Sequence, residues 1–307
     1  MCIRDSSNTK ALNSTDGSAS VVKATNTYSG TGGLHQVYLG LGWSPFKGFA
    51  IGVNAAYLWG DYSRSVINSY TDAYANTLSK YYTAEVHNYK LDFGMQYTQK
   101  ITKNDAITLG VTYGLGHKLS SDPKCQIIST NAQTAVADTA TYSIGNGLEL
   151  PHSYGVGLMW NHANRWRVGA DYTLQKWSSV AYPKFDTSTN SYELVSGQFA
   201  DRHKMTVGGE FCPDERSRNF FKRVHYRMGA SYATDYLKIK GQNGPKEYSV
   251  SAGFGIPIVN GYNNRSLLNI SAQWVRQDSK TFVTENSFRI NIGLTFNERW
   301  FAKWKME

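Results

Sequence analysis

The 307-residue sequence lacks a long hydrophobic run. Mean hydropathy is −0.45, and every apolar stretch is interrupted within a few residues. A membrane-spanning helix needs about 20 consecutive apolar residues, so none is predicted. This absence does not exclude a membrane, because the strands of a barrel hide their apolar residues by alternation.

Cysteine is scarce too, and it forms no recognisable site. Cys2, Cys125 and Cys212 include no CxxC pair and no His/Cys cluster at metal-ligand spacing. We expect free thiols, no metal and no other cofactor. No P-loop and no Ser/His/Asp arrangement in a recognisable context occurs, so the sequence predicts no enzymatic activity.

The charge of the chain is not concentrated in any segment. The formal net charge is +9, but the lysines and arginines are dispersed along the sequence without a nucleic-acid-binding motif. We therefore expect no nucleic-acid partner.

The first residues lack the basic and apolar regions of a signal peptide. The opening "MCIRDS" has the character of a translated sequencing or assembly remnant, and a polar stretch, "SSNTKALNSTDGSAS", follows it. We expect residues 1–33 to be a non-native start and a polar loop, with the true N-terminus missing.

Aromatic residues and glycine are abundant. The chain has 21 Tyr, 8 Trp, 13 Phe and 28 Gly with only 7 Pro, which favours strands and tight turns. In "RWRVGADYTLQKW" (165–177), alternate positions from Trp166 to Leu174 are apolar, and this period of two is typical of a half-buried strand. About eleven such runs occur, at 37–43, 49–59, 89–97, 107–115, 154–160, 166–174, 205–211, 224–232, 248–256, 268–274 and 288–296. The sequence predicts an all-β chain.

The connections between runs alternate in length. Several after odd-numbered runs are tight, as in "SPFKG", "KNDA" and "NHAN", whereas 60–84, 118–142 and 182–196 are longer, polar and expected to be loops. Short turns at one end and long loops at the other are typical of outer-membrane barrels.

Alternation alone also fits a soluble barrel or sandwich, so the polar face must decide. That face is rich in glycine and carries isolated charges of both signs, where a soluble exterior would show many Lys and Glu. We interpret the pattern as an antiparallel transmembrane β-barrel with its apolar face toward lipid, and keep a soluble β domain as the alternative.

Five segments in order resemble the FadL-type outer-membrane transporters of long-chain fatty acids and other hydrophobic compounds. They are "ELPHSYGVGLMW" (149–160), "GADYTLQKW" (169–177), "DRHKMTVGGEF" (201–211), "YRMGASYATD" (226–235) and "YSVSAGFGIPI" (248–258). The resemblance implies a 14-stranded barrel plugged by an N-terminal hatch. With about eleven strands and no Asn-Pro-Ala hatch motif here, residues 34–307 are expected to be an incomplete barrel domain.

The same resemblance implies a function. It predicts a monomer in the bacterial outer membrane, in contact with lipid and lipopolysaccharide, that passes hydrophobic small molecules by passive diffusion. The alternatives are a structural or secretion-associated barrel of the same family and, less favoured, a barrel enzyme.

Two sets of candidate residues follow from the pattern. The lumen-facing charges Arg167, Asp171, Glu210 and Arg227 are expected to form a polar network that supports the hatch or holds a carboxylate. Structural pairing is the favoured alternative for them, because buried charges need partners. Tyr81 and Tyr82, in a predicted loop, are candidates for capturing an apolar ligand, or they merely cap the barrel.

Overall fold

A computed structural model describes residues 6–12, 22–72, 74–215, 217–239, 241–259, 265–279 and 284–295. One antiparallel sheet of 14 strands dominates it, in the order β1-β2-β3-β4-β5-β10-β11-β14-β15-β18-β19-β20, with β7 and β8 attached beside β4. These strands are β1 (Ser6–Leu12), β2 (Val22–Phe46), β3 (Phe49–Tyr70), β4 (Thr77–Lys100), β5 (Asp105–Gly114), β7 (Lys124–Thr130), β8 (Ala137–Ser143), β10 (Ser153–His162), β11 (Trp166–Gln175), β14 (Arg202–Phe211), β15 (His225–Ala233), β18 (Lys246–Val259), β19 (Arg265–Asp278) and β20 (Glu285–Thr295).

The remaining elements are short. They are β6 (His117–Leu119) with β9 (Leu148–Leu150), β12 (Tyr182–Asp186) with β13 (Ser191–Val195), β16 (Lys238–Ile239) with β17 (Gln242–Asn243), the 3-10 turn η1 (Trp177–Ser179) and helix α1 (Phe220–Arg223). Within the described residues, no helix is long and apolar enough to cross a membrane.

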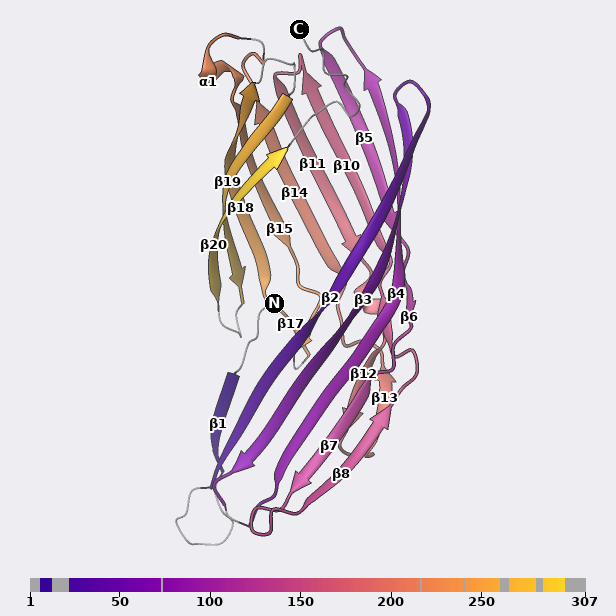
Figure 1. The fold of residues 1–307 in the computed structure, drawn as a ribbon, viewed down its shortest axis with the longest axis vertical. Helices are drawn as coiled ribbons and strands as arrows, with labels where there is room; N and C mark the ends of the chain where they lie inside the picture. The colour runs from indigo at the N-terminus through magenta and orange to yellow at the C-terminus, as the bar shows by residue number, and fades with distance from the viewer. Residues whose placement is uncertain are drawn as a thin grey trace, which may run out of the picture.

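The predicted fold class is confirmed: the chain is an antiparallel β-barrel fold, and its strands run side by side along one long axis (Figure 1). Within the described residues, each of the eleven alternating runs falls on a different strand of the main sheet, to within one residue at its ends. Alternation therefore identified these eleven strands, but not β1, β7 and β8 of the same sheet.

The strand register keeps the apolar positions on one face of the sheet. A single row of cross-strand partners passes through ten pairings: Phe46, Phe49, Tyr97, Leu109, Leu158, Ala170, Val207, Ala230, Val250, Trp274 and Phe288. These side chains point outward, and several are largely exposed, with Met228 and Ile292 in adjoining rows at 73%. A slip of one residue would reverse the faces, so this apolar set fixes the register.

The opposite face of the same strands is polar or has no side chain. One of its rows joins Asn161, Arg167, Glu210, Arg227, Gly253, Ser271 and Asn291. Polar positions inside and apolar positions outside are the arrangement of a barrel that lies in lipid.

The two ends of the wall differ, and we call them the turn end and the loop end. At the turn end, Ala163 and Asn164 both have positive φ (52° and 57°), and the Arg165 amide donates to the His162 carbonyl at 2.9 Å. Two such residues make the type of tight turn whose twist suits a hairpin, which confirms the predicted turn at "NHAN". Helix α1 lies at this end, whereas β7, β8, β12 and β13 lie toward the other (Figure 1).

Several expected loops are wholly or partly strand. β2 begins at Val22, inside the predicted loop 1–33, and β1 covers Ser6–Leu12, while residues 1–5 and 13–21 lie outside the described part. Much of the predicted loop 60–84 belongs to β3 and β4, and 118–142 and 182–196 contain further strands. Backbone pairing with a neighbour satisfies the N–H and C=O groups of polar residues such as Thr, Ser and Asn, so polarity alone did not identify a loop.

The wall is consequently uneven in height. β2, β3 and β4 have 25, 22 and 24 residues, whereas β5, β10 and β11 have 10 each. A membrane-spanning strand needs about 9–11 residues. The far halves of β2–β4, with β7 and β8 beside them, project beyond the other strands at the loop end (Figure 1).

Candidate functional site

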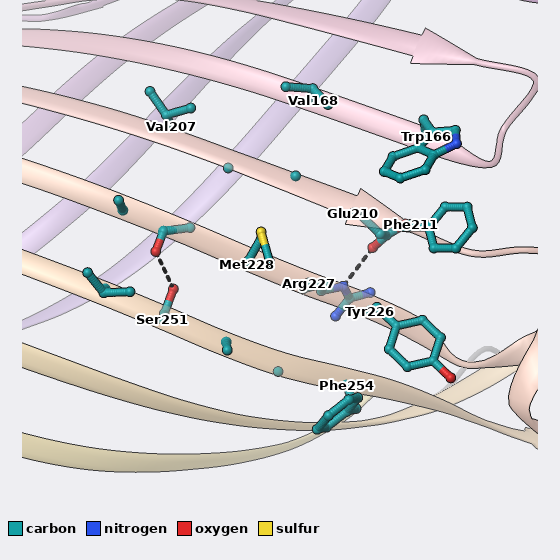
Figure 2. Close-up of a pocket in the computed structure, with 17 residues that line it drawn as sticks. Trp166, Val168, Val207, Glu210, Phe211, Tyr226, Arg227, Met228, Ser251 and Phe254 are labelled. Atoms are coloured by element: carbon teal, nitrogen blue, oxygen red, sulfur yellow. Dashed lines mark hydrogen bonds and ion pairs between the residues drawn. The ribbon is translucent and has the colours of Figure 1, made fainter.

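The inner face holds an ion-pair network centred on Glu210. Arg167, Glu210 and Arg227 occupy facing positions on β11, β14 and β15, so the register itself brings the three together. Arg167 Nη1 donates to Glu210 Oε1 at 3.0 Å, and Arg227 Nε donates to Oε2 at 2.6 Å (Figure 2 shows the second contact). Each carboxylate oxygen therefore has a guanidinium partner.

Two further residues complete what we call the Glu210 network. His225 Nδ1 lies 3.2 Å from Glu210 Oε1, and Arg227 Nη1 donates to Asn269 Oδ1 at 2.6 Å. Sequence reasoning left both out, although His225 and Asn269 share the polar parity of their strands. The alternation predicts that both side chains face inward, but it does not predict which residues on neighbouring strands a long side chain contacts.

The network carries more positive than negative charge. Two guanidinium groups share one carboxylate, and the side chains of Arg167 and Arg227 remain 39% and 38% exposed while that of Glu210 is 17% exposed. Guanidinium groups bind carboxylates well because their donors match the two oxygens. The arrangement can accept an anionic group from the lumen side.

The fourth predicted member, Asp171, takes no part in this network within the described structure. It lies on β11 four residues beyond Arg167, opposite Gly157 on one side and Thr206 on the other. At about 3.3 Å per residue, it is too far along the strand to reach Glu210.

The two candidate tyrosines lie on a strand, which corrects their placement in a loop. Tyr81 and Tyr82 belong to the projecting half of β4, opposite Ser65 and Arg64 of β3. The ring of Tyr82 lies 6.5 Å from that of Tyr192, and the guanidinium carbon of Arg64 lies 5.9 Å from its centroid. Tyr82 thus belongs to an aromatic contact with the β12–β13 hairpin, whereas Tyr81 makes no ring contact among the described residues.

A separate group of rings gathers where β11, β14 and β15 meet the loop end. We call Trp177, Tyr182, Phe199 and Tyr236 the loop-end aromatic cluster. Trp177 stacks on Tyr236 with 4.6 Å between centroids, and Phe199 meets Trp177 at 5.8 Å and Tyr182 at 5.6 Å. Phe199 is 8% exposed, and its backbone bridges to Leu237. Trp177, Tyr182 and Tyr236 are half-buried and pack with the buried ring of Phe199. Periodicity did not predict this cluster, because its residues lie in the connections.

An ion pair anchors this cluster to the wall. Lys176 Nζ donates to Asp201 Oδ2 at 2.6 Å, and the Ser178 amide donates to Oδ1 at 3.0 Å. Burial by itself would raise the pKa of Asp201, but the hydrogen bonds from Lys176 and Ser178 outweigh it and lower the pKa to about 2. The hydrogen bond that Lys176 donates to Asp201 raises the pKa of Lys176. At neutral pH this ion pair therefore joins the residue that follows β11 to the residue that precedes β14.

In the part of the chain that the structure describes, no group of three or more His, Cys, Asp or Glu side chains is placed to hold a metal ion.

Comparisons with known proteins agree with the fold. A family model described as BamG matches residues 6–307. No curated protein matches in sequence.

Three solved structures have the same fold. A CymD monoaromatic hydrocarbon channel has a TM-score of 0.60 and 12% identity, over 98% of this chain and 87% of that one. The toluene transporter TodX of P. putida has a TM-score of 0.57 and 12% identity, over 97% and 82%. The toluene transporter TbuX of Ralstonia pickettii has a TM-score of 0.54 and 11% identity, over 96% and 87%.

Proposed function

The chain belongs to the BamG family and is a β-barrel protein of the bacterial outer membrane, and from this premise we propose that it passes hydrophobic compounds, long-chain fatty acids among them, by passive diffusion. The loop-end aromatic cluster is the observation that carries the proposal. In this proposal the protein works as a monomer surrounded by lipid and lipopolysaccharide, and its loop end faces the outside of the cell. Diffusion down a gradient requires no catalytic group and no cofactor, and we propose no enzymatic activity.

A hydrophobic solute needs apolar surface at the entrance, because a water-filled pore offers it no favourable environment. Trp177, Tyr182 and Tyr236 provide such surface where the strands end, packed with the buried ring of Phe199. Aromatic rings bury a large area on contact. The channel and transporters of similar fold are described as acting on monoaromatic hydrocarbons and toluene, which supports a hydrophobic solute here.

The Glu210 network gives the fatty-acid part of the proposal its chemistry. Arg167 and Arg227 together carry one more positive charge than Glu210 can neutralise. They lie roughly 30 Å along β11 from the cluster, at about 3.3 Å per residue. A fatty acid captured at the loop end therefore meets the guanidinium groups later on its path, where they attract its carboxylate.

Uptake into proteoliposomes tests the proposal. The full chain, reconstituted in lipid vesicles, is expected to admit labelled long-chain fatty acid and toluene but not a sugar of similar mass. Trp177→Ala should lower uptake by about tenfold, because it removes a stacked ring from the cluster. Trp274→Ala is the matched control, since Trp274 lies on the outward face of β19 and should not affect entry. Equal uptake by empty vesicles would contradict transport.

A second measurement separates the carboxylate from the alkyl chain. Arg167→Gln should reduce uptake of a fatty acid but not of the fatty alcohol of the same length. Glu210 keeps Arg227 as its partner in this variant, so the wall should remain folded. If both solutes slow equally, the network has a structural role only.

The projecting halves of β2–β4 favour a second candidate, a structural or secretion-associated barrel. They extend far beyond the length that a bilayer requires, with β7 and β8 beside them. A scaffold would retain its protein partners in cross-linking experiments while its proteoliposomes fail to take up any of the solutes above.

A further inference from the structure

The outward face of the sheet is not uniformly covered. Over β11, β14, β15 and β18 it contains a depression of about 870 Å³. Its floor consists of outward positions with little or no side chain, namely Gly209, Ala230 and Ala252, which lie on three successive strands. Figure 2 views these strands with the labelled apolar side chains standing around the hollow.

Large apolar side chains form the walls. Trp166 and Phe211 stack with 4.1 Å between centroids, and Tyr226 meets Phe254 edge to face at 5.8 Å, so aromatic rings border the depression toward the turn end. Val168, Val207 and Val250 border it elsewhere, and Met228 projects beside the floor. The hollow opens away from the lumen, so whatever fills it comes from the bilayer side.

Basic side chains lie at the turn end, just beyond the aromatic wall. Arg165 precedes Trp166, and its carbonyl accepts from the Cys212 amide at 2.9 Å, which places it at the ends of both β11 and β14. Lys222 belongs to α1, which is joined to the wall by the hydrogen bond from Tyr226 Oη to the Phe221 carbonyl at 3.1 Å. Arg165, Arg218 and Lys222 are exposed. The same connection also carries Asp214 and Glu215, which are outnumbered by the basic residues Arg165, Arg218, Lys222 and Arg223. The hollow is therefore apolar along its length, with an excess of basic over acidic residues at one end.

We propose that this depression binds one anionic phospholipid, with an acyl chain in the hollow and the phosphate against Arg165, Arg218 and Lys222. Apolar area buried without a polar group suits a hydrocarbon chain. Basic residues at the membrane surface attract anionic headgroups. A second copy of the chain fits less well, because a twofold pair would bring two like-charged rims together.

Gly209 provides a clean way to fill the hollow. A Cβ built at Gly209 has nothing closer than the Arg167 carbonyl oxygen at 3.7 Å, so Gly209→Leu places a side chain in the depression without meeting the backbone. Ala272→Leu is the matched control, because Ala272 lies in the same outward row on β19 but does not line the depression. Arg218→Gln with Lys222→Gln removes charge at the rim and leaves the sheet unchanged.

The full-length protein is taken into nanodiscs of equal phosphatidylglycerol and phosphatidylcholine, extracted in mild detergent, and examined by native mass spectrometry. One phosphatidylglycerol should remain bound. Gly209→Leu should reduce the retained lipid by about tenfold relative to Ala272→Leu. The rim variant should abolish the preference for phosphatidylglycerol over phosphatidylcholine.

Four results would overturn the proposal: equal retention by Gly209→Leu and Ala272→Leu, equal retention of the two lipids by the unaltered chain, displacement of phosphatidylglycerol by added lipopolysaccharide alone, or a dimer that only Gly209→Leu dissociates. Circular dichroism shows whether Gly209→Leu is folded. If it is not, the lipid preference of the Arg218→Gln, Lys222→Gln variant decides whether the proposal holds.

Discussion

Arg227 on β15 reaches over the intervening strand β18 to donate from Nη1 to Asn269 Oδ1 on β19, 2.6 Å away. The path is open because the inward positions of β18 that it crosses are Gly253 and Gly255. A Cβ built at Gly255 would lie 3.1 Å from His225 Cβ and 3.3 Å from Arg227 Nη2. The two inward glycines of β18 thus let the guanidinium of Arg227, on β15, contact side chains on β14 and β19.

Gly255→Val should therefore displace Arg227 and destabilise the folded barrel by about 1.5–3 kcal/mol, the value of a hydrogen bond to a charged group. Urea unfolding in lipid vesicles measures this change. Gly293→Val is the control, since Gly293 faces inward beside Asn269 and a Cβ there meets nothing within 4 Å. If Gly255→Val lowers the unfolding free energy by the same amount with Asn269→Ala present as without it, loss of the Arg227–Asn269 hydrogen bond does not explain the destabilisation.

Glu210→Gln should cost about 1–3 kcal/mol of unfolding free energy, less than a fully buried pair because the guanidinium groups are partly exposed. The variant leaves Arg167 and Arg227 with no carboxylate between them. Asp171→Asn, on the neighbouring strand and outside the network, should change stability by less than about 0.5 kcal/mol. Equal losses in the two variants would contradict the central role of Glu210.

Leu109→Arg should destabilise the protein by about 2–4 kcal/mol if the position lies at the bilayer midplane. Leu109 points outward between Leu158 and Tyr97 and is 46% exposed. Its neighbour Gly110 points inward, and a Cβ there meets nothing within 4 Å, so Gly110→Arg should be tolerated. Unfolding in vesicles compares the two. Reversal of the order would mean that the faces of the sheet are assigned the wrong way round.

Acid should loosen the loop end. The folded pKa of Asp201 is about 2, below the value of about 3.9 for an unfolded Asp. Because the folded pKa is depressed, this carboxylate stabilises the fold above about pH 4, and the contribution is lost as the pH falls toward 2. Denaturation midpoints measured from pH 5 to pH 2 should fall less steeply for Asp201→Asn than for the unaltered chain. Parallel curves would show that the Lys176 contact contributes nothing.

Cys125 and Cys212 should remain reduced and slow to react in the folded protein. They are 0% and 2% exposed, and burial raises the pKa of both thiols. Cys125 lies on β7 toward the loop end and Cys212 in the connection to α1 at the turn end, too far apart to be joined. N-ethylmaleimide followed by intact mass should label them only after denaturation. A Cys125–Cys212 disulfide in the folded monomer would overturn the topology.

The eleven alternating runs of the wall were predictable from sequence because each has its own period of two, and the period needs no knowledge of neighbours. β1, β7, β8 and the projecting halves of β2–β4 were not, because their polar residues were interpreted as loops. Arg167, Glu210 and Arg227 were predictable as facing the same side because of that period of two. The contacts that join them were not predictable. The hydrogen bond from Arg227 to Asn269 depends on β19 lying two strands away from β15 in the sheet, and on the glycines of the strand between them. Tyr82 was misplaced because its polar surroundings resemble a loop until β7 and the β12–β13 hairpin are packed nearby.

The uneven height of the wall determines what the surroundings of the cell can touch. In the proposed orientation, with the loop end outside, the projecting halves of β2–β4 and the adjoining β7 and β8 stand above β10, β11, β14, β15, β18, β19 and β20. A bacteriophage, an antibody or a protease that approaches the cell meets those segments first. Selection by such encounters would act on residues 60–86 and 117–143, while in the same proposed orientation the turn end and its basic residues would stay out of reach beneath the bilayer.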